Sequence, residues 1–241
     1  MWTSPVSLFA SGNVVLVSVM VMSAGGIFTW IWAKRTGIPF RQRCLPVMFM
    51  NSAYMAIPVN TLLWGKEGTT YTIIYNMAVT VAHFTVGIYL VARREPVAEM
   101  FRVPIIYAVA AGMALNAFSI QPPASVAILI GALSRMTLAA MLLFVGYRLC
   151  LACVSSMKDA VIGVVLRMGG GALVAAILVN ILGISGPAAG VCIMTSAMPA
   201  AVNAYLLAEQ YDSDPSFAAS AVFLGTVLSL LVIPLIAFIM P

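Results

Sequence analysis

Two segments of this 241-residue chain place a proline and an asparagine inside a long apolar stretch. One segment, MNSAYMAIPVNTLL, runs from Met50 to Leu63, and the other, MTSAMPAAVNAYLL, runs from Met194 to Leu207. A proline inside a helix removes a backbone donor and clashes with the preceding turn. In lipid, the carbonyl and N–H groups left unpaired need protein, water or a ligand as partners. Each segment is therefore predicted to be a broken membrane helix with a polar interruption near mid-depth.

The groups around the two breaks suit a small anion. Each downstream half-helix begins with free N–H groups and a partial positive charge, which favour a carboxylate. One proline in a membrane helix is usually a plain kink, so the matched pair is what favours a site. The predicted substrate-binding residues are Asn51, Pro58, Asn60, Thr195, Ser196, Pro199 and Asn203.

Two ionisable residues fall deep inside apolar runs and are candidates for coupling or gating. At ~1.5 Å per residue, His83 lies roughly 20 Å into run 70–92 and Arg135 roughly 16 Å into run 124–149. His83 could instead be a neutral imidazole bonded to a neighbouring helix, and Arg135 could lie near the outer interface if its helix begins later. Arg167 is nearer the end of its run, and we expect its side chain to snorkel to the cytoplasmic surface.

The same runs contain no Asp or Glu at mid-depth. His83 is therefore the obvious carrier if protons are coupled to transport. Sodium could bind to unwound carbonyls and to Asn or Thr oxygens, but the sequence does not require it.

The elements that must position these groups are apolar runs, each close to the ~20 residues that cross a hydrocarbon core. The chain is 63% hydrophobic and 8% charged, whereas about a quarter of a soluble domain is charged. We therefore expect an all-α integral membrane protein with about eight transmembrane helices. The predicted spans are 8–32, 45–64, 70–92, 103–120, 124–149, 159–183, 187–208 and 215–239.

The charged residues and the cysteines argue against several other kinds of partner and site. The net charge of +5 is spread between the apolar runs, so no nucleic-acid partner is expected. Cys150 and Cys153 form a CxxC near a helix end, without a second pair. We therefore expect no metal site and no cofactor.

Basic residues in alternate loops set the expected orientation, because positive loops stay cytoplasmic. Both termini are then predicted to be non-cytoplasmic. The loop between the last two spans is expected to be cytoplasmic although it carries Glu209, Asp212 and Asp214, since acidic residues contribute little to orientation. The basic loop residues are Lys34, Arg35, Arg41, Arg43, Arg93, Arg94, Arg102, Arg148 and Lys158.

The two proline segments also define an inverted repeat. Each is the middle one of three spans, and the two triplets enter the membrane from opposite sides, which is typical of a transporter with a midplane site. Spans 103–120 and 124–149 have no mates before residue 8, so two N-terminal spans of a five-plus-five plan are expected to be missing. We predict one transporter domain over 1–241, with a partial first repeat at 8–92 and a second repeat at 103–239.

The stretches FMNSAYMAIPVNTLLWGKEGTTYTIIYNMAV and SAMPAAVNAYLLAEQYDSDPSFAASAVFLGTVLSLLVIPL resemble the auxin efflux carrier family, also called the PIN-like or malate/malonate permease group. The resemblance implies a fold similar to that of bile-acid–sodium symporters, with two broken crossing helices, here 45–64 and 187–208. The crossover asparagine of the family matches Asn51, its crossover prolines match Pro58 and Pro199, and Asn203 is a further match. Family glycines near the first crossing are replaced by Ser52-Ala53 and Met55-Ala56.

The expected function is secondary transport of a small organic anion, such as malate, malonate or an auxin-like acid, by alternating access. The lipid bilayer is the other expected partner, in a plasma membrane such as a bacterial inner membrane, and a homodimer is left open. A membrane enzyme is disfavoured by a single histidine and no buried carboxylate. The remaining alternative is a truncated, non-transporting protein that needs a partner to supply two missing helices.

Overall fold

The computed structural model describes residues 8–92, 96–101, 123–151 and 157–239, and isolated positions between 107 and 118. Most of the predicted span 103–120, and Cys153, lie outside these residues. The described part is helical, with one isolated bridge between Met50 and Ala200. The helices are α1 (Leu8–Thr36), α2 (Phe40–Met48), α3 (Ala56–Ala82), the π-helix η1 (His83–Gly87), α4 (Ile88–Val91), α5 (Pro96–Phe101), α7 (Ala124–Leu151), α8 (Met157–Val164), the π-helix η2 (Val165–Gly170), α9 (Gly171–Ile181), α10 (Gly186–Ser196), α11 (Val202–Gln210) and α12 (Pro215–Ile239).

Four helical stretches in the described part are long and apolar enough to cross a membrane. They overlap the predicted spans 8–32, 70–92, 159–183 and 215–239. The predicted span 187–208 is instead divided between the short helices α10 and α11, and the predicted span 45–64 is divided between the end of α2 and the first residues of α3. In both spans the chain leaves helical geometry near the middle. The four stretches are Ser11–Thr36, Ala56–Val91, Met157–Ile181 and Pro215–Ile239.

The stretch from Ala56 contains two helices rather than one. Trp64 and Gly65 have non-helical backbone angles, and Gly65 has a φ of 57°, which favours glycine. Beyond this kink the chain returns along itself, so that the Asn60 amide donates to the Thr72 hydroxyl at 2.8 Å. A Cβ at Gly68 would overlap the Asn60 carbonyl. Residues 56–63 therefore form a half-helix packed against the start of the next span.

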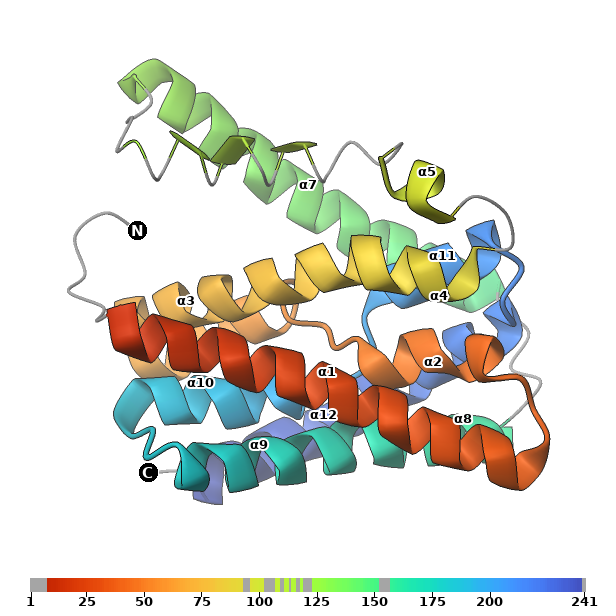
Figure 1. Cartoon of the computed structure of the whole chain (residues 1–241). Helices are drawn as coiled ribbons and strands as arrows, with labels where there is room; N and C mark the ends of the chain where they lie inside the picture. Colours follow the sequence, from red (N-terminus) through yellow and green to blue (C-terminus); the bar gives the residue numbers. More distant parts are fainter. Residues whose placement is uncertain are drawn as a thin grey trace.

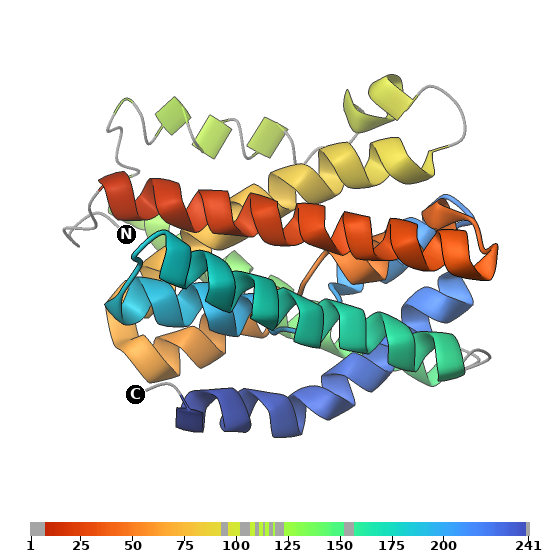
Figure 2. The ribbon, with the colours of Figure 1, turned by 60° about the horizontal axis from the view of Figure 1, so that its bottom comes forward.

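The helices that hold the two divided segments form one packed group (Figure 1). In Figures 1 and 2, α1 lies beside the continuous helix formed by α8, η2 and α9, and the two run in opposite directions. Helix α2 enters the group from the end where α1 stops, and α10 enters from the end where α9 stops. They meet in the middle of the group, where Phe49, Met50, Met194 and Met198 are buried.

One end of this group is held by charged side chains. Arg43 of α2 donates to the carboxylate of Asp159 in α8 at 2.8 Å, and also to the carboxylate of Asp214. Arg41 donates to the Asp212 carbonyl at 3.2 Å. The start of α2, the start of α8 and the turn before α12 therefore lie at the same end of the molecule. The acidic turn and the basic loop at this end partly neutralise each other.

Candidate functional site

The two divided segments cross through their backbones. The Asn51 N–H donates to the Pro199 carbonyl at 2.8 Å, and the Ala201 N–H donates to the Phe49 carbonyl at 2.9 Å. These reciprocal bonds make a short antiparallel bridge between Met50 and Ala200. Each break therefore supplies partners for backbone groups that the other break leaves unpaired, as a non-helical segment inside a membrane requires.

The two predicted prolines have different positions at this crossing. Pro199 is buried inside the second break, between the end of α10 and the start of α11. Pro58 is exposed and is the third residue of α3, in the first helical turn, where proline is tolerated because its missing donor has no helical partner. The first break covers residues 49–55, so it ends before its proline.

The carbonyl ends of α2 and α10 converge on Arg167. This side chain is 1% exposed and comes from the π-helix η2. Its guanidinium donates to the carbonyls of Val47 at 3.2 Å, Met48 at 3.0 Å and Ser196 at 2.8 Å. The expectation that Arg167 snorkels to the cytoplasmic surface is therefore wrong, because carbonyls at the helix ends replace the water that a guanidinium would otherwise seek.

A second polar cluster lies on this carbonyl side. The Asn60 amide donates to the Thr195 hydroxyl at 2.9 Å, and the Ser196 hydroxyl is bonded to the Tyr75 hydroxyl at 2.9 Å. Asn60, Thr195 and Ser196 are completely buried, and none of them lines the cavity described next. Oδ1 of Asn60 has no partner among the described residues.

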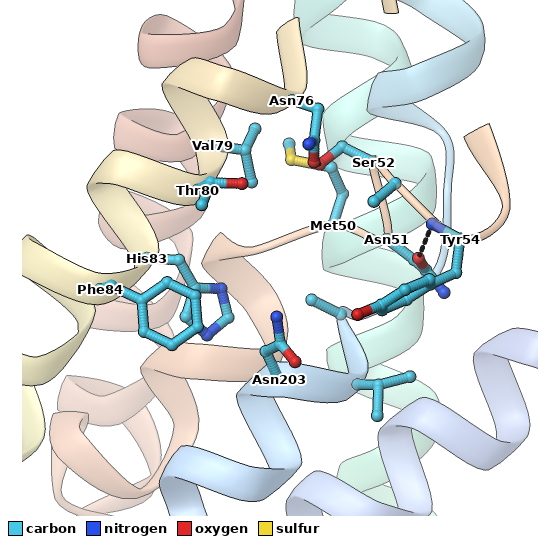
Figure 3. A pocket seen from close by; sticks show the side chains of 13 residues that line it. Met50, Asn51, Ser52, Tyr54, Asn76, Val79, Thr80, His83, Phe84 and Asn203 are labelled. Atoms are coloured by element: carbon cyan, nitrogen blue, oxygen red, sulfur yellow. Dashed lines mark hydrogen bonds between the residues drawn. The ribbon is translucent and has the colours of Figure 1, made fainter. Parts of the chain in front are cut away.

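A cavity of about 30 Å³ lies on the other side of the crossing, at the N-terminal ends of the downstream helices (Figure 3). It is bounded by the turn that leads into α3, by the first residues of α11 and by one face of the span 70–92. Among the predicted site residues it collects Asn51, Asn203 and His83. The lining residues are Met50, Asn51, Ser52, Ala53, Tyr54, Asn76, Val79, Thr80, His83, Phe84, Ala201, Val202 and Asn203.

The polar side chains of the cavity are only partly engaged with one another. Oδ1 of Asn51 accepts the Tyr54 N–H at 3.1 Å, which positions the turn into α3. The Ser52 hydroxyl donates to Oδ1 of Asn76 at 2.8 Å. The Asn203 amide projects from the start of α11 into the space between His83 and Tyr54 (Figure 3).

His83 stands at the junction of α3 and η1. Its ring is 2% exposed and lies between the Phe49 ring, with centroids 4.3 Å apart, and the Phe84 ring, at 5.3 Å. Nε2 of His83 has no partner in the described part of the chain. A single π-turn is often found at a functional site because it re-aims the side chains around it. Arg135 lies on α7, and its side chain is outside the described residues.

Several cavity residues were not singled out from the sequence. Asn76, Thr80 and His83 are spaced four and three residues apart, so they share one face of a helix. A polar stripe on an otherwise apolar membrane helix is the sequence signal that would have found Asn76 and Thr80. Tyr54 and Ser52 carried no comparable signal, because they lie in the irregular turn between two helices.

The two sides of the crossing differ in electrostatic character. The C-terminal ends of α2 and α10 carry partial negative charge and are bonded to a guanidinium. The N-terminal ends of α3 and α11 carry partial positive charge and border a cavity with neutral amide, hydroxyl and imidazole groups. The partial positive charge on the cavity side favours an anion, and the partial negative charge on the carbonyl side favours a cation.

Comparisons with known proteins give two similarities. The sequence profile of the family described as Membrane transport protein matches residues 96–237, which include Arg167 and the second break. A protein of Methanothermobacter thermautotrophicus described as an uncharacterized transporter is 27% identical over 235 residues. This similarity covers 92% of the chain and 78% of the relative. Both similarities are to transporters, and neither specifies a substrate.

Proposed function

Because this chain belongs to the auxin efflux carrier family of membrane transport proteins, and is a transporter rather than an enzyme, we propose that it moves small organic anions by alternating access. The single observation that carries the choice of an anion is the cavity at the crossing. Two helix N-termini meet there beside Asn51, Asn203 and His83, and none of the described lining residues is a carboxylate. The proposed substrates are carboxylates such as malate, malonate or auxin-like acids.

The proposed architecture is one transporter domain over 1–241, with eight spans and an inverted repeat between 8–92 and 103–239. The antiparallel directions of α1 and of α8 with η2 and α9 support the repeat. Arg43, Asp159 and Asp214 form a charged cluster. This cluster supports placing the loops that carry these residues on the same side of the membrane. With the positive loops in the cytoplasm, both termini lie outside a plasma membrane such as a bacterial inner membrane.

Within this site, we assign direct substrate contact to Asn51 and Asn203 and a coupling or gating role to His83. Pro199 and Pro58 shape the crossing and the helix start that surround the substrate. Asn60, Thr195 and Ser196 support the crossing from its carbonyl side.

The cavity corresponds to a closed form of the site. Ligand pockets are commonly about 300–1,000 Å³, whereas this cavity measures about 30 Å³, enough for a water-sized group only. Binding of a carboxylate therefore requires the helices around the crossing to separate. Alternating access supplies such a movement, since one group of helices shifts against another around a fixed site.

Replacement of Asn203 by Asp tests the anion site with almost no change in shape. The new carboxylate would repel a carboxylate substrate, and the lost donor would remove a hydrogen bond to a charged group. Such bonds contribute about 1.5–3 kcal/mol, so we expect the apparent affinity to fall by about 10- to 100-fold. The measurement is uptake of labelled malate, malonate and an aromatic carboxylate into liposomes that contain the purified protein.

The matched control is Asn180→Asp. Asn180 is an exposed asparagine of α9, and its side-chain amide donates to the Ala176 carbonyl of its own helix at 2.8 Å. Uptake by this variant should equal that of the wild type. Equal uptake by the Asn203→Asp protein would show that the cavity is not the substrate site, and selective uptake of cations would refute the choice of an anion.

A further inference from the structure

The position of Arg167 is unusual for a buried arginine. Three backbone carbonyls accept its hydrogen bonds, from the last turns of α2 and α10. In the described part of the chain, its guanidinium has no ion pair with a carboxylate, and its Nε has no partner. A buried arginine normally pairs with an acidic side chain, so the carbonyls must compensate this charge.

Two helix C-termini can supply that compensation. Each helix end carries a partial charge equivalent to roughly −0.5, and the two ends that meet here sum to roughly −1. One guanidinium matches this charge. Converging carbonyls at the C-terminal ends of broken helices are also the groups that coordinate a coupling cation such as Na⁺ in transporters.

The surroundings of Arg167 leave no room for a second cation. Gly171 lies one helical turn further along, and a Cβ at this position would overlap both Nη2 of Arg167 and the Ser196 carbonyl oxygen. The Tyr75 hydroxyl occupies the adjoining space with its bond to the Ser196 hydroxyl. The guanidinium is therefore enclosed by backbone and hydroxyl groups that face it closely.

We propose that Arg167 is a built-in cation that permanently fills a coordination site formed by the half-helix C-termini. Transport by this chain then proceeds without sodium, because the protein already carries the charge that a coupling cation would bring. Removal of the guanidinium leaves a cage of carbonyls that binds a monovalent cation. The part of the inference that concerns sodium and transport rests on the proposed function. The carbonyl cage does not, because it follows from the contacts at the crossing alone.

The experiment measures thermal unfolding of the purified protein in detergent, in NaCl and in choline chloride at equal ionic strength. The wild type should unfold at the same temperature in both salts. The Arg167→Ala protein should unfold several degrees lower, and both Na⁺ and millimolar guanidinium should restore part of the loss, whereas choline should not. The control, Arg35→Ala, removes an exposed arginine and should show no difference between salts.

Three further variants keep the proposal testable if Arg167→Ala does not fold. Arg167→Lys retains the charge, whereas Arg167→Gln retains only a polar group. Na⁺ should therefore raise the unfolding temperature of Arg167→Lys less than that of Arg167→Gln. Gly171→Ala should displace the guanidinium and lower the unfolding temperature. Wild-type stability that depends on Na⁺, or neutral variants that gain nothing from Na⁺ or guanidinium, would overturn the proposal.

Uptake in liposomes separates this inference from the proposed function. Carboxylate uptake by the wild type that is equal with Na⁺ and choline supports both proposals, and uptake that requires Na⁺ refutes the built-in cation alone. A cation-specific rescue of Arg167→Ala in a protein that moves no carboxylate would refute the proposed substrate class and leave the carbonyl cage in place.

Discussion

Two buried arginines of this molecule meet opposite kinds of partner. Arg43 binds two carboxylates at one end of the helix group and lies 4.3 Å from the centre of the Phe217 ring. Among the residues that the structure describes, the hydrogen bonds of the Arg167 guanidinium go to carbonyls at the crossing. The positive charge of Arg43 is therefore stabilised by ion pairs, and that of Arg167 by the carbonyls at helix C-termini. The two positions should respond differently to substitution.

Replacement of Arg43 by alanine should lower the free energy of unfolding by about 3 kcal/mol, since removal of one partner from a buried ion pair is costly. The Arg43 side chain is 6% exposed, and both carboxylates are about one quarter exposed, which places the effect at the lower end of the usual range. The measurement is thermal or denaturant unfolding in detergent micelles.

The control for this prediction is Asp159→Asn, which leaves Asp214 as the partner of Arg43 and should cost clearly less. If the Arg43→Ala protein is as stable as the wild type, the prediction is wrong, and the charged cluster does not stabilise the fold.

Residue types and depth were enough to single out some of the residues that line the cavity. Asn51, Asn203 and His83 were predicted, and the structure brings all three to one cavity. Asn60 was predicted beside them, yet it lies in the cluster on the carbonyl side. Arg167 was misplaced because its depth in a helix says nothing of its partners. The Met48 carbonyl is 119 residues away in the chain, and no local pattern connects the two.

At the scale of helices, the divided segments show what a proline can and cannot predict. Pro199 lies inside its break, whereas Pro58 lies in the first turn of α3, after the break. The first break is fixed by its backbone bonds to the second one. A pattern based on proline therefore locates a broken helix to within a few residues, and the paired segment sets the actual bounds.

The packing of α10 against the kink in α3 gives a prediction at this scale. A Cβ at Gly190 would overlap the Trp64 ring, so Gly190→Val should lower stability by about 1–3 kcal/mol through overpacking. A second change, Trp64→Leu, should recover part of this loss, because the smaller side chain makes room. Unfolding of the two single variants and the double variant measures the coupling between the positions.

Gly12→Val provides the comparison, since a Cβ at that helical position has no atom from elsewhere in the described part of the chain within 4 Å. It should leave stability within about 0.5 kcal/mol of the wild type, as is usual for surface changes. Equal losses for the two glycine variants, or no recovery in the double variant, would contradict the close contact with Trp64.

At the scale of the whole molecule, hydropathy predicts eight apolar runs, and four described helices are long enough to span a membrane. The difference of four arises in three ways. Runs 45–64 and 187–208 are divided, run 103–120 lies mostly outside the described residues, and run 124–149 contributes only the shorter apolar helix Ala124–Leu133 to the residues described in full. Apolar composition indicates that a segment lies in lipid or in the protein core. It does not report whether the segment crosses as one helix, because a break can be paired by another break.

The proposed orientation predicts the sides on which two exposed positions react. Ser185 precedes α10 and Gln210 ends α11, at opposite ends of the second divided segment. In intact cells, an impermeant maleimide should label Ser185→Cys, and it should label Gln210→Cys only after the cells are permeabilised. Cys150 and Cys153 are first replaced by serine, while Cys44 and Cys192 are buried and can remain.

The parent protein without an added cysteine serves as the blank for this experiment. If Gln210→Cys is labelled in intact cells and Ser185→Cys is not, the proposed orientation is wrong and both termini lie in the cytoplasm.

The distance along the chain between the two halves of the crossing has a consequence for biosynthesis. Helix α2 and its break leave the ribosome well before Arg167 and the second break, which supply their partners. At ~5–20 residues per second, 119 residues take roughly 6–24 seconds to synthesise. During that interval the Val47 and Met48 carbonyls have none of the bonds that they make in the folded protein. The insertion machinery or membrane water must solvate this half-helix until the second half of the chain arrives.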